Sequence, residues 1–396
     1  MAERKPVVGI LGAGAMGAGI AQIAALRGHT VVLADAHSGA CDAARERILK
    51  SLAREVEKKR LQHGDVDEAL ERLLLTHLDA ARGYDAFGAC DIVIEAIVEQ
   101  LDAKRTAFRQ LEAAVHEDCI LASNTSSLSI AGIAGACERP QRALGVHFFN
   151  PATVMPLVEI VPGVRTDAAV VAAARSVVDS WGKTTVLALD TPGFIVNRVA
   201  RPYYGEALRI LDEGIASTSD IDWAMTSLGG FRMGPFELMD FIGHDVNYVV
   251  TESVWTALYY DPRFKPSLTQ RRLLEAGLLG KKSGRGFYDY GDGAQRPAAK
   301  QDRTLGATIL NRILAMLVNE AVDAVYHRIT TVADIEVAMT KGMNYPKGLL
   351  AWGEEIGLDR VLAEIDSLHD EYHEDRYRAS ALLRRMVRER KSFFGE

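Results

Sequence analysis

The most constraining feature of this 396-residue chain is the stretch from Pro6 to Asp35. A short apolar run of the kind found in buried parallel strands leads into the spacing Gly12-x-Gly14-x-x-Gly17, and an apolar helical pattern follows. A second apolar run ends in Asp35. In such a strand–turn–helix unit, Gly12 permits the tight turn, Gly14 lets the backbone approach a pyrophosphate, and Gly17 lets the helix pack closely on the strand.

This fingerprint predicts a Rossmann domain that binds a dinucleotide. The helix N-terminus offers unpaired N–H groups to phosphates, and Asp35 stands where a carboxylate can accept both hydroxyls of an adenosine ribose. The same carboxylate would repel a 2′-phosphate, so we expect NAD rather than NADP. A merely structural glycine turn is the alternative, but strand, helix and acid all stand at the expected distances.

Strand and helix patterns alternate to about residue 190 and predict a doubly wound parallel sheet, an α/β fold. Residues 40–75 read as a charged helical stretch, interrupted near Gly64, and predict a helical hairpin inserted into this domain. Because ligands bind beyond the carboxyl ends of strands in such sheets, we expect the chemistry there. The polar residues at or just after predicted strand ends are Glu99, Ser126, His147 and Asn150.

The remainder of the chain reads as helical and contains an internal repeat. Asn197-Arg198 and Glu206-Ala207 return as Asn311-Arg312 and Glu320-Ala321, an offset of 114 residues (311 − 197). Breaks in the pattern fall near residue 190 and at 291–300. We therefore expect a Rossmann domain at 1–190, a helical domain at 191–291 and a second, degenerate copy of that helical domain at 300–396.

Composition excludes several classes of function. The net charge is −7 with no basic stripe, so nucleic acid and anionic membranes are not expected partners. No apolar run approaches the length of a membrane span, and Met1 to Pro6 lead directly into the first strand, so we expect neither a span nor a signal peptide. The four cysteines and the other potential ligands lack metal-site spacing, which indicates a cytoplasmic protein with reduced thiols and no metal.

His147 and Glu159 are the candidate catalytic pair. His147 ends one predicted strand, and Glu159 lies in the next, Leu157-Val-Glu-Ile-Val161. A carboxylate that faces an imidazole fixes its tautomer and stabilises the imidazolium that forms when the ring takes a proton. A core histidine beside a solvated glutamate is the alternative, and the two residues alone leave both open.

Six motifs occur in order along nearly the whole chain. They are Ser123-Asn-Thr-Ser-Ser127, His147-Phe-Phe-Asn-Pro151, Leu157-Val-Glu159, Thr191-Pro-Gly-Phe-Ile-Val-Asn-Arg198, Met233-Gly-Pro-Phe-Glu-Leu238 and Gly280-Lys-Lys-Ser-Gly284. Together they resemble the L-3-hydroxyacyl-CoA dehydrogenases. The resemblance implies oxidation of a (3S)-hydroxyacyl-CoA to the 3-ketoacyl-CoA, with NAD as the hydride acceptor.

The resemblance also implies roles for matching residues. His147 would remove the 3-hydroxyl proton, and Glu159 would orient the imidazole. Ser126 and Asn197 would hydrogen-bond the reacting oxygen and the thioester carbonyl side, which implies an active site between the Rossmann and helical domains. Cofactor contacts are implied for Glu99, Lys104, Asn150 and Lys282, and contacts to the CoA tail for Ser51 and Lys58.

Within this family the chain is most similar to the long enzymes of phenylacetate degradation that act on 3-hydroxyadipyl-CoA. Arg198-Val-Ala-Arg-Pro-Tyr-Tyr204, Gly243-His-Asp-Val-Asn247 and the tandem helical domain carry this similarity. Pro156 departs from the family pattern, in which a lysine usually precedes Leu-Val-Glu, and this puts in doubt a contact from that position to an acidic substrate. Adipyl, butyryl and longer acyl chains stay open.

The second helical copy keeps Asn311 but has no counterpart of His147 or Glu159. We expect it to be structural and to replace the partner subunit on which single-copy relatives bury an apolar face. The protein would then be a monomer with an internal pseudo-dimer, or a homodimer.

Two other functions are compatible with a Rossmann start. A dehydrogenase of a free 3-hydroxy acid would need no CoA clamp, and Ser51 and Lys58 argue against it. A non-catalytic NAD-binding structural protein would have no physical need for Ser126, His147, Glu159 and Asn197 together.

Overall fold

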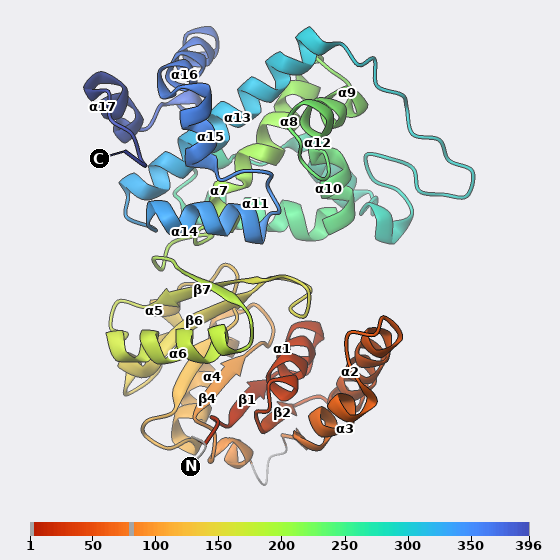
Figure 1. Cartoon of the computed structure of the whole chain (residues 1–396), viewed down its shortest axis with the longest axis vertical. Coiled ribbons are helices and arrows are strands. Elements are labelled where there is room, and N and C mark those ends of the chain that lie inside the picture. Colours follow the sequence, from red (N-terminus) through yellow and green to blue (C-terminus); the bar gives the residue numbers. More distant parts are fainter. Residues whose placement is uncertain (1–3, 79–82, 396) are drawn as a thin grey trace. The chain divides into compact units, whose positions relative to one another are not determined.

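The computed structural model describes residues 4–78 and 83–395, and the chain divides into two compact units between Thr191 and Pro192. The N-terminal unit is α/β and the C-terminal unit is helical (Figure 1).

An eight-stranded sheet forms the centre of the N-terminal unit, with the order β3-β2-β1-β4-β5-β6-β7-β8. Neighbouring strands pair in parallel except β6 and β7, which are antiparallel. The expected doubly wound Rossmann sheet is therefore confirmed, with one reversal. The strands are β1 (Val8–Leu11), β2 (Val31–Asp35), β3 (Leu73–His77), β4 (Ile92–Glu95), β5 (Ile120–Ser123), β6 (Ala143–Phe148), β7 (Leu157–Pro162) and β8 (Thr184–Leu187).

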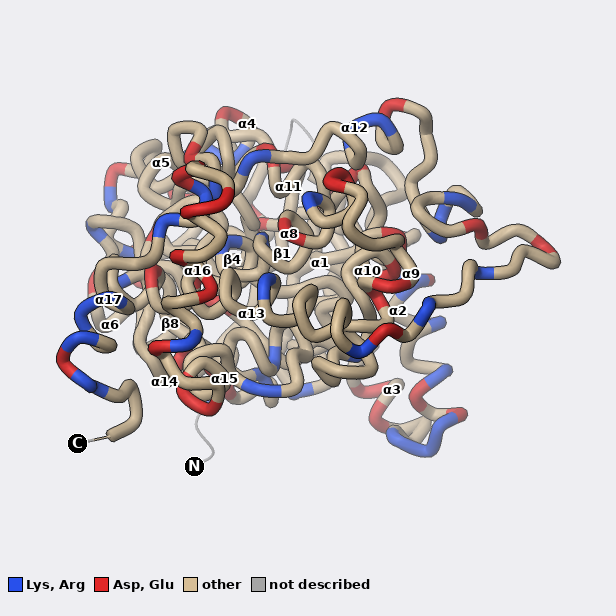
Figure 2. Tube along the Cα trace, turned by 90° about the horizontal axis from the view of Figure 1, so that it is seen from above, with Lys and Arg blue, Asp and Glu red and all other residues tan. Residues whose placement is uncertain are grey.

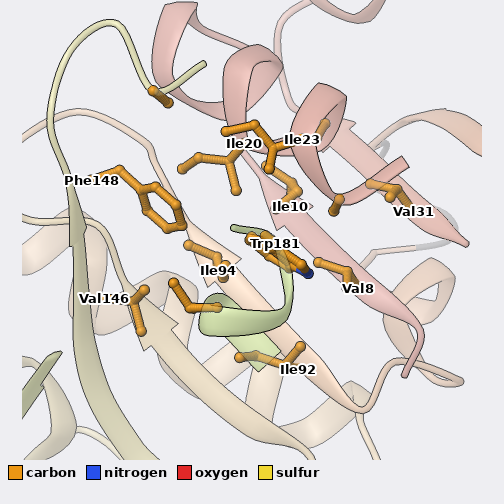
Figure 3. Packing of buried hydrophobic residues seen from close by; sticks show 14 of the residues in the cluster. Val8, Ile10, Ile20, Ile23, Val31, Ile92, Ile94, Val146, Phe148 and Trp181 are labelled. Carbon is orange, nitrogen blue, oxygen red and sulfur yellow. The ribbon is translucent and has the colours of Figure 1, made fainter. Parts of the chain in front are cut away.

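Successive side chains of a strand point to opposite faces of a sheet. Because the strands are apolar on both faces, helices cover both of them. Leu33 of β2 belongs to one apolar cluster and its neighbour Val32 to the other. Figure 3 shows part of the first cluster, in which Trp181 lies among side chains of β1, β4 and α1 (Ala15–Leu26). The helices of this unit are α1 (Ala15–Leu26), α2 (Ala40–Glu57), α3 (His63–Glu71), α4 (Leu101–Ala114), α5 (Ile130–Ala134) and α6 (Ala168–Ser180).

Two segments differ from the sequence prediction. The inserted helical hairpin exists as α2 and α3, but the prediction of helix through Leu75 is wrong, because Leu73–His77 forms β3 and pairs in parallel with β2. A short apolar run cannot be assigned to helix or strand by periodicity alone. The sheet is also not parallel throughout, since the connection 149–156 between β6 and β7 is too short for the crossover that parallel neighbours need.

The C-terminal unit consists of helices and divides into two similar halves that are consecutive in the sequence. The first half contains α7 (Val196–Val199), α8 (Arg201–Asp212), α9 (Thr218–Trp223), α10 (Pro235–Ile242), α11 (His244–Ala257) and α12 (Leu268–Glu275). The second half contains α13 (Arg303–Tyr326), α14 (Val332–Val337), α15 (Leu349–Ile356), α16 (Leu358–Tyr372) and α17 (Ala381–Glu389).

The two halves repeat each other in detail. Helices α9 and α10 begin 114 residues before α14 and α15 (332 − 218 and 349 − 235), and a π-helical turn follows both α9 and α14. Asp222 accepts hydrogen bonds from the first turn of α10, and Glu336, its counterpart, does the same for α15. The repeated sequence thus builds the same local structure twice.

Reciprocal ion pairs join the two halves, and α8 lies beside α13 (Figure 1). Arg198 Nε lies 2.7 Å from Glu320 Oε1, and its counterpart Arg312 places Nε 3.1 Å from Glu206 Oε2. All four side chains are buried. Arg198 and Glu206 of the first half are the equivalents of Arg312 and Glu320 of the second half, so the same contact is made in both directions. The halves therefore pair as the subunits of a two-fold dimer do.

Helix α13 is long and apolar enough to cross a membrane by length and composition alone, with a mean hydropathy of 1.3 over its most apolar window. The sequence-based expectation, that no apolar run reaches that length, did not identify Arg303–Tyr326. However, 72% of that window is buried inside the protein, and the helix carries the buried charges Arg312 and Glu320. These features are those of the central helix of a folded core.

Candidate active site

The glycine turn after β1 has the geometry of a phosphate cradle. A Cβ on Gly12, whose φ is +107°, would lie 2.6 Å from the Ala96 carbonyl oxygen, and one on Gly17 would lie 1.8 Å from the Gly12 oxygen. A Cβ on Gly14 would meet nothing within 4 Å, although Gly14 is the N-cap of α1. The protein thus leaves space at Gly14 beside a helix N-terminus, which is where a pyrophosphate binds in this fold.

This difference between two glycines gives a test. We expect Gly14→Ala to leave the melting temperature close to that of the wild type, because the methyl group meets no protein atom, but to raise the Kd for NAD at least tenfold. Gly17→Ala should instead lower the melting temperature, because the helix must move away from the strand. Thermal unfolding and a fluorescence titration with NAD distinguish the two, and unchanged NAD binding by Gly14→Ala would contradict the cradle.

Asp35 ends β2 with its carboxylate held beside the glycine turn. Oδ2 accepts the Ala13 N–H at 2.8 Å, and Oδ1 accepts the His37 N–H at 2.8 Å. Partial burial alone would raise the pKa of Asp35, but these hydrogen bonds keep it below its ordinary value. The carboxylate is therefore ionised at neutral pH and fits the predicted ribose contact.

Glu99 organises the loop that follows β5. Its Oε1 accepts the Thr125 hydroxyl at 2.6 Å and the N–H groups of Ser126 and Ser127 at 2.9 and 3.1 Å. Burial acts to raise the pKa of Glu99, but the charge of Lys104 and the hydrogen bonds of this loop together lower it. Glu99 and Ser126, both predicted site residues, are thus brought together, with the Ser126 hydroxyl 3.4 Å from Glu99 Oε1.

Lys104 lies beneath this loop. Its side chain is 1% exposed, and Nζ lies 2.6 Å from Glu95 Oε1 and 3.3 Å from Glu99 Oε2. This burial favours a positioning role for Lys104 over the direct cofactor contact that the resemblance implied. Glu95, which also accepts the Ser123 hydroxyl at 2.6 Å, was not predicted. An acidic residue at the end of the otherwise apolar strand β4 is the sequence signal that could have revealed it.

His147 and Glu159 lie directly opposite each other on β6 and β7. His147 Nδ1 is 2.6 Å from Glu159 Oε2, and the two residues are 5% and 0% exposed. The antiparallel register creates this pair, and Asn124 holds the end of β6 by accepting the Phe148 N–H at 2.8 Å. An ionised carboxylate can only accept, so this contact selects the imidazole tautomer with the proton on Nδ1. The alternative of a solvated glutamate is wrong, because Glu159 is fully buried.

Three other predicted residues of this unit lie at its surface or half-buried. Asn150 is exposed after β6. Ser51 is half-buried on α2, and Lys58 is exposed at its end, 3.4 Å from Glu55. Basic residues gather where α2 ends and α3 begins (Figure 2). The predicted contacts of Asn150 with the cofactor, and of Ser51 and Lys58 with the CoA tail, stay predictions.

Two predicted residues belong to the helical unit. Asn197 is half-buried on α7. Lys282 is exposed, and its Nζ forms an ion pair with Asp245. Their contacts with substrate and cofactor also stay predictions.

Within residues 4–78 and 83–395, no group of three or more His, Cys, Asp or Glu side chains could hold a metal ion. All four cysteines are free thiols. Burial raises the pKa of Cys90, Cys119 and Cys137 to about 12, so these thiols stay protonated at neutral pH.

Comparisons with known proteins match both units. The family model described as 3-hydroxyacyl-CoA dehydrogenase, NAD binding domain, matches residues 7–191, and the model of the C-terminal domain of the same family matches twice, at residues 193–290 and 309–392. The 3-hydroxyadipyl-CoA dehydrogenase of Escherichia coli is 37% identical over 95% of this chain and 96% of its own length. The human mitochondrial hydroxyacyl-coenzyme A dehydrogenase is 41% identical over 72% of this chain and 90% of its own.

A crystal structure of 3-hydroxybutyryl-CoA dehydrogenase from Escherichia coli has the same fold. It superposes with a TM-score of 0.90 at 35% identity and covers 97% of this chain and 98% of its own. The likeness therefore extends across both units and both helical copies.

Proposed function

The chain belongs to the 3-hydroxyacyl-CoA dehydrogenase family and is an NAD-dependent enzyme of that class, and on this premise we propose that its reaction depends on His147 and Glu159 as a general-base pair. NAD, when bound, supplies the acceptor for the hydride that leaves C3 of the substrate. The space at Gly14, the α1 N-terminus and the ionised Asp35 are the features of this chain that fit the cofactor.

In the proposed reaction His147 accepts the proton of the 3-hydroxyl group. Because Nδ1 is engaged by Glu159 at 2.6 Å, the proton is taken by Nε2. The imidazolium that results is stabilised by the buried carboxylate, whose attraction is strong because both groups are shielded from water. In the reverse direction the same pair returns the proton to the 3-keto oxygen.

Ser126 and Asn197 would orient the substrate. The Ser126 backbone is fixed by Glu99, which Lys104 and Thr125 hold in turn, so the Ser126 hydroxyl is presented from a rigid loop. Asn197 would hydrogen-bond the thioester carbonyl side from the helical unit. Ser51 and Lys58 would contact the CoA tail, with the exposed ammonium of Lys58 exchanging its contact with Glu55 for one with a phosphate.

The observation that carries this proposal is the buried hydrogen bond between His147 and Glu159 at the carboxyl end of β6. The test is NADH formation with (3S)-hydroxybutyryl-CoA, its (3R) enantiomer and free (3S)-hydroxybutyrate, all at the same concentration. We expect turnover of the (3S) thioester, with kcat/KM at least about 100 times that of the free acid, because the free acid lacks every contact to the CoA tail.

Equal use of the free acid would instead make the protein a dehydrogenase of free 3-hydroxy acids. NAD binding without turnover of any of the three compounds, or of longer (3S) thioesters, would favour a non-catalytic NAD-binding protein.

A further inference from the structure

Arg201, the first residue of α8, is a buried cation without an acidic partner among the described residues. Its side chain donates from Nη1 to the Thr251 hydroxyl at 3.0 Å, whereas its buried Nε has no hydrogen-bond partner. Arg201 is 6% exposed. The other buried arginines of the described chain each form an ion pair with a carboxylate, namely Arg142, Arg198, Arg263 and Arg312. Arg201 alone in this set lacks the countercharge that burial of a cation demands.

Two tyrosines accompany this arginine. Arg201 Cζ lies 4.9 Å from the centre of the Tyr204 ring. The buried Tyr345 hydroxyl has no hydrogen-bond partner. Burial raises the pKa of Tyr345 well above its ordinary value, and the positive charge of Arg201 opposes this rise, so the two groups lie within electrostatic range of each other. Both Arg201 Nε and the Tyr345 hydroxyl are donors that lack an acceptor, which an anionic ligand would supply.

The pairing of the two helical copies does not require these polar groups. At the positions related by 114 residues, the chain places only apolar side chains: Arg201 corresponds to Ala315, Tyr204 to Val318, and Tyr345 to Phe231. Arg201, Tyr204 and Tyr345 therefore form a polar cluster at one of the two positions that the repeat relates, and the other position is apolar. Asn197, on α7, lies four residues before Arg201 in the chain, and Ala200 separates the two helices.

We propose that Arg201, with the Tyr345 hydroxyl, binds the distal carboxylate of a dicarboxylic 3-hydroxyacyl-CoA and so determines acyl-chain specificity. This inference rests on the proposed function, in which Asn197 contacts the thioester side of the substrate. Four residues of chain reach at most about 14 Å, so the side chains of Asn197 and Arg201 can both reach one short acyl-CoA substrate. A guanidinium can offer two parallel N–H groups to one carboxylate. An acidic substrate then does not need the lysine that Pro156 replaces.

The test compares two thioesters with six-carbon acyl chains that differ in the distal carboxylate, (3S)-hydroxyadipyl-CoA and (3S)-hydroxyhexanoyl-CoA. For the wild type we expect a higher kcat/KM with the adipyl compound. In Arg201→Met the ratio of the two kcat/KM values should fall about 100-fold, mainly through KM of the adipyl compound, whereas Arg201→Lys should keep part of the preference. Tyr345→Phe, which introduces the residue found at position 231, should lower the ratio less.

Arg271→Met is the matched control, because Arg271 is exposed on α12 and pairs with Glu275. It should leave the ratio unchanged. Since Arg201→Met removes an unpaired buried charge, it should not lower the melting temperature of the unliganded protein. A second measurement needs no turnover: hydroxyadipyl-CoA should raise the melting temperature of the wild type more than that of Arg201→Met.

Each outcome is decisive. Equal changes for both thioesters in Arg201→Met, or a wild type that prefers the hexanoyl compound, would overturn the role of Arg201 while the proposed dehydrogenase function stands. A wild type that forms NADH from neither compound, nor from the butyryl compound, would overturn both proposals.

Discussion

In His147→Gln we expect kcat to fall by a factor on the order of 100 or more, while the Kd for NAD stays within about twofold of the wild type. Glutamine keeps a polar group near Glu159 but cannot take the proton of the 3-hydroxyl group. The cofactor-fitting features, the glycine turn and Asp35, lie on β1, α1 and β2, away from His147 along the sheet order. Steady-state kinetics and an NAD titration measure the two effects separately.

Glu159→Gln is the companion variant, because it retains the shape of the side chain and removes its charge. It should also lower kcat, by less than His147→Gln does, since the imidazole remains present but loses the carboxylate that stabilises its protonated form. A His147→Gln protein that loses NAD affinity and turnover in equal measure would show that the histidine is structural.

The second large effect is expected from deletion of residues 300–396. The shortened chain loses α13, and with it Glu320 and Asp323, which neutralise the buried Arg198 and Arg263. The apolar face of α8 is exposed as well. We therefore expect aggregation, or dimerisation through that face, in size-exclusion chromatography.

A single substitution isolates the contribution of charge. Glu320→Gln should lower the free energy of unfolding by about 1.5–3 kcal/mol, because Arg198 loses its nearest carboxylate and keeps only Asp323 at 3.5 Å, whereas Arg263 retains Asp323 and Asp261. Its control is Glu355→Gln, which removes an exposed ion pair with Lys347 and should cost less than about 1 kcal/mol. A soluble, monomeric truncation with unchanged stability would contradict the structural role of the second copy.

Much of the fold could be predicted from the sequence because its signals are local. The glycine turn has fixed spacing, and the helical repeat is visible when the chain is compared with itself. The strand β3 escaped prediction because Leu73-Leu-Leu suits a helix as well as a strand, and its pairing with β2 is a contact between residues about forty positions apart. The reversal at β7 also depends on pairing, although the short connection before Leu157 indicates it.

The candidate site was predicted in part for the same reason. Motifs indicated His147 and Glu159, but the register that places them opposite each other is a tertiary property. Lys104 reads as a surface residue of a helix, and only the fold shows that it is buried against Glu95. The sequence shows an arginine at position 201 but cannot show that it lacks an acidic partner. That property depends on all the residues that surround Arg201 in the folded protein.

The covalent joining of the two helical copies has a consequence for how such a surface can change. In a homodimer every substitution is made in both subunits, so a residue that suits a ligand at one position also appears at the position related to it by the two-fold axis. Here the two equivalent positions are encoded separately, so the first copy can have Arg201 where the second copy has Ala315. Their association is also intramolecular, so the fraction of paired halves does not decrease on dilution. A melting temperature that is independent of protein concentration is the physical signature of that arrangement.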